Sequence, residues 1–378
     1  MSQELSFIPI AEPDIGEAEE KYLLDAYRSG WISSLGNYLE RFETSFSSYC
    51  GAQHGVAVSN GTVALQLALL AAGVGVGDEV IVPSLTFVAT AAAVLHTGAK
   101  PVFVDCEPEI GTMDPAAFEC AITPKTKAVI PVHLYGHPAD MDEIMSVAAR
   151  HNLVVIEDAA EAHGARYKGK LVGSIGHMAT FSFYGNKILT TGEGGMVLTS
   201  DDRYATKIRF LKDHAMDPSR KYWHPEVGYN FRMTNLQAAI GCAQLERVDD
   251  LLEKRRFVVD CYKKELTETP SVLVNPRRGW AEPVPWLVCA ILPKGTTREQ
   301  RDCLIKDLRA RGIDSRPYFN LASDMPPYVS FRTPGDLHVS SDLSARGLNL
   351  PTSTMLTAES ISFICGNFIE LVEKIQRR

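Results

Sequence analysis

The residues best suited to chemistry lie in the stretch SFYGNKILTTGEGGM, residues 182–196, where Lys187 is the only basic side chain. A crowded or buried lysine has a lowered pKa, and its neutral amine can then form a Schiff base with a carbonyl group. Ser182 adds a hydroxyl group, and the segment TGEGG is flexible enough to fold closely over a bound group. A single lysine is more often a solvated surface charge, so its meaning depends on the residues that accompany it.

A second group of residues follows a predicted strand in the stretch VSNGTVAL. The strand ends at Ser59, and Gly61 and Thr62 then begin a helix whose free N–H groups favour a phosphate. Gly61 allows an anion to approach the backbone, and Thr62 supplies a hydroxyl group. The same pattern also describes an ordinary helix cap, so it does not establish a phosphate site by itself.

A third group closes the predicted strand in LVVIEDAAEAHGA. Glu157 and Asp158 are adjacent, so their side chains point to opposite faces of the sheet and one of them can enter a site. A desolvated Asp158 could keep a ring nitrogen of a cofactor protonated, although a solvated strand end is the simpler alternative. Phe87, in PSLTFVAT, could stack on such a ring or belong to the core.

Together the three groups meet the demands of pyridoxal 5'-phosphate, which needs a phosphate cradle, a carboxylate for its ring nitrogen and a lysine. The glycines at 192–195 fit neither a Walker A loop nor a GxGxxG motif. The sequence therefore predicts a pyridoxal-phosphate enzyme and no metal site.

The elements that position these groups alternate as strand and helix from about residue 54, which predicts an α/β fold with a mostly parallel central sheet. Ligands of such sheets bind at the carboxyl ends of the strands. Residues 235–268 are expected to form one helix of about 50 Å. We expect a large cofactor domain over residues 1–249 and a smaller α+β domain over 250–378, with roughly the first 20 residues as candidates to pack on the smaller domain.

Composition excludes several other classes of protein. The formal net charge of −8 argues against binding to nucleic acid or to an anionic membrane surface. The eight cysteines show no CxxC pair, which argues against a zinc site or a disulfide framework. The first residues are acidic and lack the features of a signal peptide, so a cytoplasmic location is expected.

The chain resembles the sugar aminotransferases of the DegT/DnrJ/EryC1/StrS family, which are fold-type-I pyridoxal-phosphate enzymes. The similarity runs through WISSLGNYLERFE, SNGTVAL, DEVIVPSLTF, PVHLYGH, IEDAAEAHGA, FSFYGNKILTTGEGG, GYNFRMTNLQAAIG and GLNLPT. It implies that Lys187 is the Schiff-base lysine and proton carrier, and that Asp158 is the partner of the pyridinium nitrogen. Related dehydratases carry histidine at the position of Lys187, so the lysine favours transamination.

The resemblance also implies the remaining cofactor contacts. Gly61, Thr62 and Ser182 would hold the phosphate, and Asn230 would reach that phosphate from a second subunit, which makes the active unit a homodimer with shared sites. Phe87 matches the aromatic residue that stacks on the ring. Glu161 occupies a position where many members have Gln or His near the phenolic oxygen of the cofactor.

Within the family, NKILTTGEGGM, KYWHPEVGYNFRMTN and SRPYFN are most similar to members that aminate C4 of GDP-4-keto-6-deoxymannose with L-glutamate as donor. A UDP- or dTDP-linked keto sugar is the alternative substrate. A non-catalytic regulatory protein and a fold-type-I enzyme acting on amino acids are more remote alternatives. The nucleotide diphosphate needs basic partners, and the candidates are Lys221, His224, Arg232 and Arg316.

Overall fold

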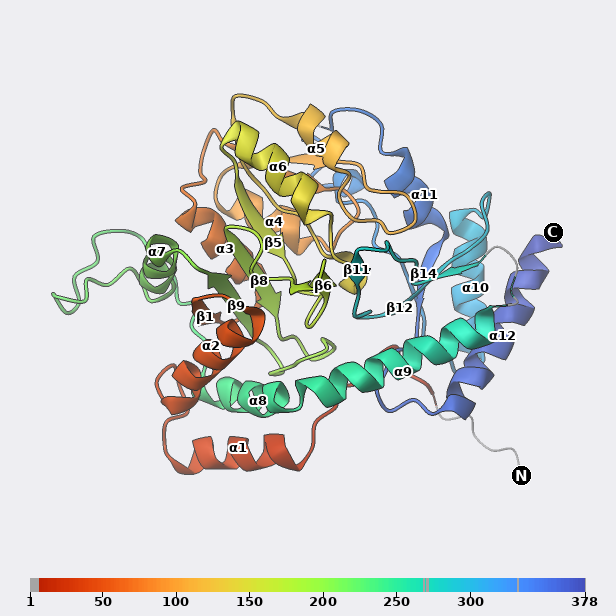
Figure 1. Ribbon diagram of the computed structural model, residues 1–378, viewed down its shortest axis with the longest axis horizontal. Coiled ribbons are helices and arrows are strands. Elements are labelled where there is room, and N and C mark those ends of the chain that lie inside the picture. The colour runs from red at the N-terminus through yellow and green to blue at the C-terminus, as the bar shows by residue number, and fades with distance from the viewer. Residues whose placement is uncertain (1–6, 268, 270–271, 332, 378) are drawn as a thin grey trace.

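A computed structural model describes residues 7–267, 269, 272–331 and 333–377 of the 378-residue chain. Its largest element is a seven-stranded sheet with the strand order β1-β9-β8-β5-β4-β2-β3 (Figure 1). Only β9 runs antiparallel to its neighbours, so the predicted mostly parallel sheet is confirmed. The strands are β1 (His54–Val58), β2 (Glu79–Pro83), β3 (Lys100–Val104), β4 (Thr126–Val129), β5 (Val154–Asp158), β8 (Met178–Ser182) and β9 (Gly195–Thr199).

Helices cover both faces of this sheet because its strands are apolar on both faces. In β5, for example, Val155 packs into one hydrophobic cluster and its neighbour Ile156 into the other. The first cluster is completed by helices α2 (Asn37–Cys50), α5 (Pro115–Ala121), α6 (Met141–His151) and α8 (Asn235–Glu246). The second is completed by α3 (Gly61–Ala71), α4 (Ala89–His96) and α7 (Asp202–Lys212).

A second, antiparallel sheet lies beside the first and has the order β10-β12-β14-β13. Its apolar side chains share a separate cluster with three long helices, which lie together at the right of Figure 1. The strands are β10 (Leu273–Val274), β12 (Val288–Ile291), β13 (Arg316–Pro317) and β14 (Gly347–Leu350), and the helices are α9 (Val248–Leu266), α10 (Arg298–Ala310) and α12 (Ala358–Gln376). The domain boundary near residue 250 stays a prediction.

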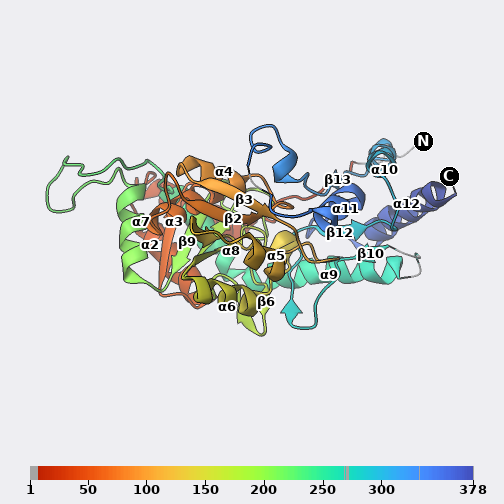
Figure 2. The ribbon, with the colours of Figure 1, turned by 90° about the horizontal axis from the view of Figure 1, so that it is seen from above.

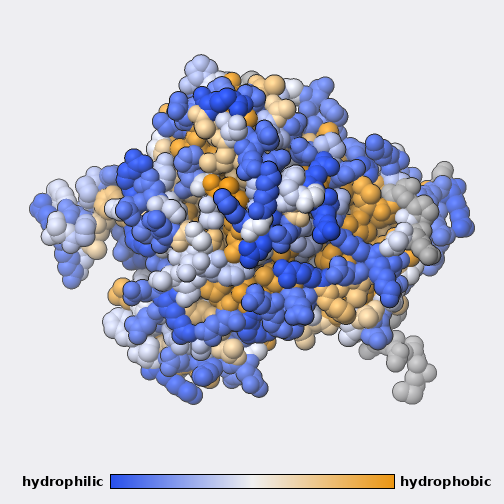
Figure 3. Space-filling model, viewed as in Figure 1, coloured by the Kyte–Doolittle hydropathy of each residue, from blue (hydrophilic) through white to orange (hydrophobic). Residues whose placement is uncertain are grey.

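Shorter elements complete the described part of the chain. A three-stranded sheet consists of β6 (Arg166–Tyr167), β7 (Lys170–Leu171) and β11 (Ala281–Glu282), and α11 (His338–Arg346) precedes β14. Two short 3-10 turns, Leu134–Gly136 and Ala322–Asp324, lie in connecting segments. Within the described residues, no helix is both long and apolar enough to cross a membrane. Hydrophilic residues dominate the face seen in Figure 3, with hydrophobic side chains in recesses between them.

The segment between α7 and α8, residues 213–234, forms an arm that extends away from the rest of the molecule in both ribbon views (Figures 1 and 2). Its outer part carries three exposed apolar side chains, those of Tyr222, Trp223 and Val227. At its base, the N–H group of Ser59 donates to the carbonyl oxygen of Phe231 at 2.9 Å, so the arm leaves the sheet next to the end of β1.

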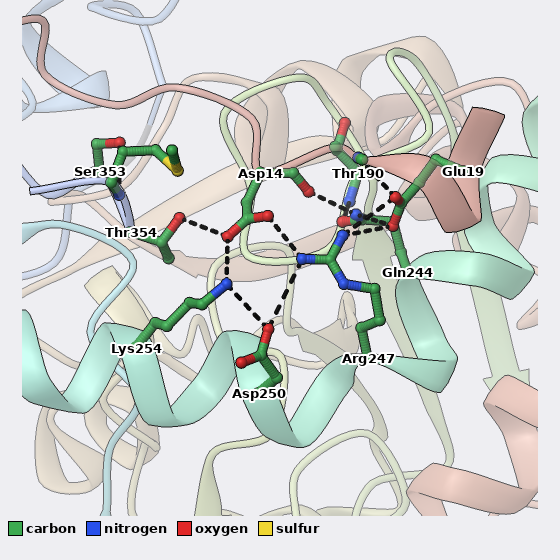
Figure 4. Close-up of polar contacts among 11 residues, drawn as sticks. Asp14, Glu19, Thr190, Gln244, Arg247, Asp250, Lys254, Ser353 and Thr354 are labelled. Atoms are coloured by element: carbon green, nitrogen blue, oxygen red, sulfur yellow. Dashed lines mark hydrogen bonds and ion pairs between the residues drawn. The ribbon is translucent and has the colours of Figure 1, made fainter.

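The prediction of one unbroken helix over residues 235–268 was wrong. The structure has two helices, α8 and α9, separated by Arg247, whose φ of −102° and ψ of 9° are not helical. The guanidinium of Arg247 donates to Asp14 at 2.7 Å and to Glu19 at 2.9 Å, as Figure 4 shows. Glu19 lies in α1 (Glu17–Arg28), which packs along α8. The break therefore forms where the N-terminal segment is bound.

The residues before α1 contact the second sheet as well. The N–H group of Ile8 donates to the carbonyl of Gly312 at 2.8 Å, and that of Thr352 donates to the carbonyl of Ile10 at 2.7 Å. Asp14 accepts hydrogen bonds from Lys254 and Thr354 (Figure 4). Residues 8–14 therefore form a strap between the small sheet and the junction of α8 with α9.

Candidate active site

Lys187 lies in the loop after β8, at the carboxyl edge of the large sheet. The backbone folds tightly there, since the N–H group of Lys187 donates to the carbonyl of Tyr184 at 2.9 Å. The lysine side chain is only 10% exposed, and its amine lies 3.9 Å from a carboxylate oxygen of Glu161. Burial lowers the pKa of Lys187, and the carboxylates of Glu161 and Asp158 offset part of that effect. The structure thus encloses the one lysine that the sequence singled out.

Asp158 ends the neighbouring strand β5, and its carboxylate is buried. The hydroxyl of Thr90 donates to one carboxylate oxygen at 2.8 Å, and the N–H group of Ala160 donates to the other at 3.3 Å. Burial raises the pKa of Asp158, while the hydrogen bonds from Thr90 and Ala160 oppose the rise. These bonds hold Asp158 in a defined position within a protein environment that lacks bulk water.

Glu157 points to the opposite face of the sheet, as expected of a neighbour in a strand. It accepts hydrogen bonds from His133 at 3.0 Å and from the N–H groups of Gly173, Ile175 and Gly176. His133 must donate through Nε2, because its Nδ1 accepts from the N–H group of Ala139. Burial raises the pKa of Glu157, but these bonds outweigh burial and leave the pKa below its ordinary value. Glu157 is therefore a structural anion, and Asp158 is the acid that belongs to the site.

Glu161 is the second carboxylate near the lysine. It follows β5 by three residues, and the N–H group of Tyr135 donates to its other oxygen at 2.7 Å. Burial raises the pKa of Glu161 to about 7, although the charge of Lys187 acts in the opposite direction. A proton can therefore reside on this side chain near neutral pH.

The start of α3 and the end of β8 meet closely. A Cβ atom at Gly61 would lie 2.8 Å from the Cβ atom of Ser182, so only glycine fits this position. The side chain of Asn60 caps the helix by accepting from the N–H group of Val63 at 3.0 Å. The first amides of a helix have no intrahelical acceptor, so those of Gly61 and Thr62 are available to an anion beside the Ser182 hydroxyl.

The glycine segment TGEGG packs tightly beside these residues. A Cβ atom at Gly195 would lie 2.4 Å from the carbonyl oxygen of Asn60, and one at Gly194 would lie 2.2 Å from the hydroxyl of Thr191. The N–H group of Thr191 donates to the carbonyl of Phe183. The segment is thus a close-packed turn that connects the lysine loop to β9.

Phe87 lies after β2, also at the carboxyl edge of the sheet, and its side chain is 53% exposed. Its ring centroid is 5.7 Å from that of Phe319, which belongs to the segment after β13. An aromatic ring exposed at a site edge can stack on a planar group. The enclosed amine, the buried carboxylate, the helix start with its two free amides and this ring fit pyridoxal phosphate.

The basic residues predicted for a nucleotide diphosphate are not gathered at the lysine. Arg232 pairs with Asp213 at 2.6 Å at the base of the arm, and the ring nitrogen Nδ1 of His224 bonds the carbonyl of His214 at 2.8 Å. Lys221 lies over the ring of Tyr222 in the outer arm. Arg316 lies in β13 of the small sheet. Within this one chain, three of the four are arm residues.

Asn230 also lies at the base of the arm, where its side chain accepts from Arg232 at 2.8 Å. The side chain is exposed. No hydrogen bond joins it to the phosphate-site residues of the same chain among the residues described.

Several residues around the lysine were not predicted. The ring of Trp286 lies under the amine of Lys187, with 3.6 Å between Nζ and the ring centroid. Thr90 and Tyr135 bind the two carboxylates. Thr90 could have been predicted, because it follows Phe87 by three residues after the same strand, β2. Trp286 was not, because it is 99 residues from Lys187 in a stretch that reads as an ordinary strand.

Comparison with known proteins finds similarity to aminotransferases over nearly the whole chain. A model of the DegT/DnrJ/EryC1/StrS aminotransferase family matches residues 13–368. The chain is 51% identical over 361 residues to GDP-perosamine synthase of Caulobacter vibrioides. The aligned region covers 95% of this chain and 96% of that protein. It is 44% identical over 366 residues to GDP-perosamine synthase of Escherichia coli O157:H7, with 97% and 99% covered.

Among solved structures, the PMP form of Spr1654 from Streptococcus pneumoniae superposes with a TM-score of 0.92 at 30% identity. Its PLP form gives a TM-score of 0.91, and each superposition covers 98% of this chain and 99% of that chain. The predicted fold and family are therefore confirmed, and the matched region includes every residue of the site described above. This chain belongs to the DegT/DnrJ/EryC1/StrS aminotransferase family.

Proposed function

We propose that the chain is a pyridoxal-phosphate-dependent aminotransferase that converts GDP-4-keto-6-deoxymannose to GDP-perosamine with L-glutamate as the amino donor. The observation that carries the proposal is the enclosed amine of Lys187, held next to two buried carboxylates in a chain 51% identical to a GDP-perosamine synthase. The amino sugar would serve polysaccharide synthesis such as that of an O-antigen. We also propose a cytoplasmic location, where nucleotide sugars are made.

The cofactor would be held by groups from four strand ends. Gly61, Thr62 and Ser182 would bind its phosphate, and Phe87 would lie against its ring. Asp158 would bind the ring nitrogen and keep it protonated, since Thr90 and Ala160 hold the carboxylate in place. When bound, pyridoxal phosphate withdraws electrons from the carbon that carries the amino group, which allows a proton to leave that carbon.

Lys187 would move that proton. Burial lowers the pKa of its amine, so a neutral Nζ is available to accept a proton and later to return it. Glu161, 3.9 Å away, stabilises the charged form when Nζ carries the proton. Across the complete reaction, the amino group of glutamate replaces the keto oxygen at C4 of the sugar, and glutamate becomes 2-oxoglutarate.

We further propose that two chains form a homodimer in which each arm completes the site of the other subunit. The arm carries exposed Tyr222, Trp223 and Val227 within one short segment, and apolar side chains grouped on a surface mark a site that can bind another protein. The arm also carries Asn230, Arg232, Lys221 and His224, so a partner would bring an amide and basic groups to phosphates. Arg316, from the small sheet, remains a candidate contact from within the chain.

The substrate is tested with a panel of GDP-, UDP- and dTDP-linked 4-keto-6-deoxy sugars, each incubated with glutamate and pyridoxal phosphate and followed by mass. Amination replaces the keto oxygen by one hydrogen and one amino group, so product and substrate differ in mass. We expect the GDP sugar to react and the Lys187→Ala variant to be inactive. Turnover of a UDP or dTDP sugar alone would overturn the substrate and leave the reaction class intact. Full activity of Lys187→Ala would overturn the reaction class.

A further inference from the structure

The side chain of Trp286 contacts the amine of Lys187 through the face of its indole ring. The ammonium nitrogen of Lys187 lies 3.6 Å from the centroid of its indole ring, well within the range of a cation–π contact. In the described part of the chain, no oxygen or nitrogen accepts a hydrogen bond from Nζ, and the nearest carboxylate oxygen is that of Glu161 at 3.9 Å. Among the described residues, the amine thus has the ring face of Trp286 and the carboxylate of Glu161 as its near charge-stabilising contacts.

The position of the ring is fixed from three sides. Its own N–H group donates to the carbonyl of Asn186 at 2.8 Å, directly before the lysine. The backbone N–H group of Trp286 donates to the carbonyl of Tyr135 at 3.1 Å, and its carbonyl accepts from Arg255 at 3.1 Å. The residue is 7% exposed. A ring held in this way is part of the site, not a mobile cover.

The charged and titratable groups that face the amine are Glu161, Asp158 and His163. The two carboxylates favour the ammonium form of Lys187, whereas burial opposes it. His163 is neutral there, because burial lowers its pKa to about 3. An indole face attracts a cation but offers much less to a neutral amine, so it adds to the effect of the carboxylates.

We propose that Trp286 is a positioning residue whose ring face holds the free ε-ammonium of Lys187 next to Glu161. This inference rests on the proposed function, because it supposes that the amine is free during part of each turnover. The ring retains the amine while Nζ carries a proton and releases it when the proton leaves. Trp286 thereby determines the position of the lysine amine between the step in which Nζ accepts a proton and the step in which Nζ returns it.

The test measures the protonation of Lys187 directly in the cofactor-free, full-length chain. Brief labelling with acetic anhydride modifies only neutral amines, and peptide mass spectrometry gives the labelled fraction of Lys187 at each pH. Trp286→Leu removes the ring, and Trp286→Phe keeps a smaller aromatic face. Trp280→Leu is the matched control, since Trp280 lies in the same segment but packs on Tyr167 and His137.

We expect the midpoint of Lys187 labelling to fall by about one pH unit in Trp286→Leu and by roughly half as much in Trp286→Phe. Trp280→Leu should leave the midpoint unchanged. A midpoint in Trp286→Leu equal to that of the control would overturn the proposal. If Trp286→Leu does not fold, judged by circular dichroism, Trp286→Phe decides alone, and an unchanged midpoint in that variant overturns the proposal equally.

This outcome is separable from the fate of the proposed function. Attachment of pyridoxal phosphate to Lys187 is scored on its own, by borohydride reduction of the cofactor-loaded chain and mass analysis of the peptide. Failure of attachment in the wild-type chain would count against the proposed function, whatever the labelling shows. Normal attachment with an unchanged labelling midpoint would count against the role of Trp286 alone.

Discussion

Glu161 and Lys187 form a buried pair in which a carboxylate oxygen lies 3.9 Å from the amine nitrogen and neither side chain is more than 10% exposed. Burial moves the two pKa values toward each other, upward for Glu161 and downward for Lys187. Burial thus disfavours the charged form of both members of the pair. This relationship has a measurable consequence for stability.

The pKa of Glu161 rises from 4.5 to about 7 on folding, so the protonated carboxyl group stabilises the folded chain relative to the ionised one. This stabilisation is fully present below pH 4.5 and is lost as the pH rises through 7. Glu161→Gln cannot ionise, so the free energy of unfolding of this variant should lack that fall, which we expect to be roughly 1–3 kcal/mol between acid and alkaline conditions. Urea unfolding of the cofactor-free chain across this pH range measures it. Glu253→Gln, at an exposed carboxylate, is the control, and equal pH dependence in both variants would contradict the prediction.

The adjacent acids Glu157 and Asp158 should separate stability from activity. Asp158→Asn keeps the shape of the side chain but removes the charge, and we expect kcat/KM to fall roughly 10²–10³-fold with little loss of stability. Glu157→Gln leaves N–H donors without an acceptor at a buried site, so it should cost about 2–4 kcal/mol of stability. Steady-state kinetics and urea unfolding of both variants test the pair. If Glu157→Gln lost activity and Asp158→Asn lost stability instead, Glu157 would be the carboxylate of the active site.

The contact between Gly61 and Ser182 should limit cofactor binding. Gly61→Ala would place a methyl group 2.8 Å from the Cβ atom of Ser182, so the helix start must move away from the anion. We expect the Kd of pyridoxal phosphate to rise about tenfold or more, equivalent to about 1.4 kcal/mol. Titration followed by visible absorbance gives the Kd. Gly75→Ala, where no atom lies within 4 Å, should bind the cofactor normally.

The shared site can be tested by mixing inactive subunits. Lys187→Ala lacks the amine, and Asn230→Asp would bring a negative charge to the phosphate of the partner site. In a mixed dimer one site receives both defects and the other receives neither. After subunit exchange at equal concentrations, half of the dimers are mixed, so about a quarter of the wild-type activity should return. Absence of recovery, with exchange demonstrated by native mass spectrometry, would rule out sharing through Asn230.

The contacts of Arg247 in Figure 4 should contribute to stability in a pH-dependent way. Burial raises the pKa values of Asp14 and Glu19, but hydrogen bonds from Arg247, Lys254 and Gln244 outweigh it and leave both values lowered. Their contribution is therefore present above the pKa of the unfolded carboxyl groups and is lost as the pH falls through the folded values.

Arg247→Met should lower the free energy of unfolding at neutral pH by about 1–3 kcal/mol and reduce its dependence on acid pH. Arg150→Met is the matched control, because its pair with Glu119 is half-exposed and should contribute less than about 1 kcal/mol. Urea unfolding at neutral and acid pH compares the two variants. Equal losses would mean that the Arg247 contacts act no differently from a surface pair.

The sequence was sufficient for two residues of the site, for different reasons. Asp158 could be found because it ends a predicted strand, and ligands bind at the carboxyl ends of such strands. Lys187 could be found because it is the only basic residue in a stretch of small residues, hydroxyl groups and glycines. The break at Arg247 could not be found, since its partner Asp14 is 233 residues away and the local sequence suits a helix. Trp286 could not be found either, because it is also distant in sequence and no local pattern indicates which segment covers the lysine. Helices α1 and α2 were not predicted at all.

The strap of residues 8–14 sets a limit on how far the small sheet can swing open. Ile10 is bound to Thr352 beyond the end of β14, and Asp14 is bound to Arg247 at the helix junction. A chain of four residue steps reaches at most about 14 Å when fully extended. Any opening that admits a nucleotide sugar must therefore break the hydrogen bond between Thr354 and Asp14 and stay within this tether length, or else release one of the two attachments.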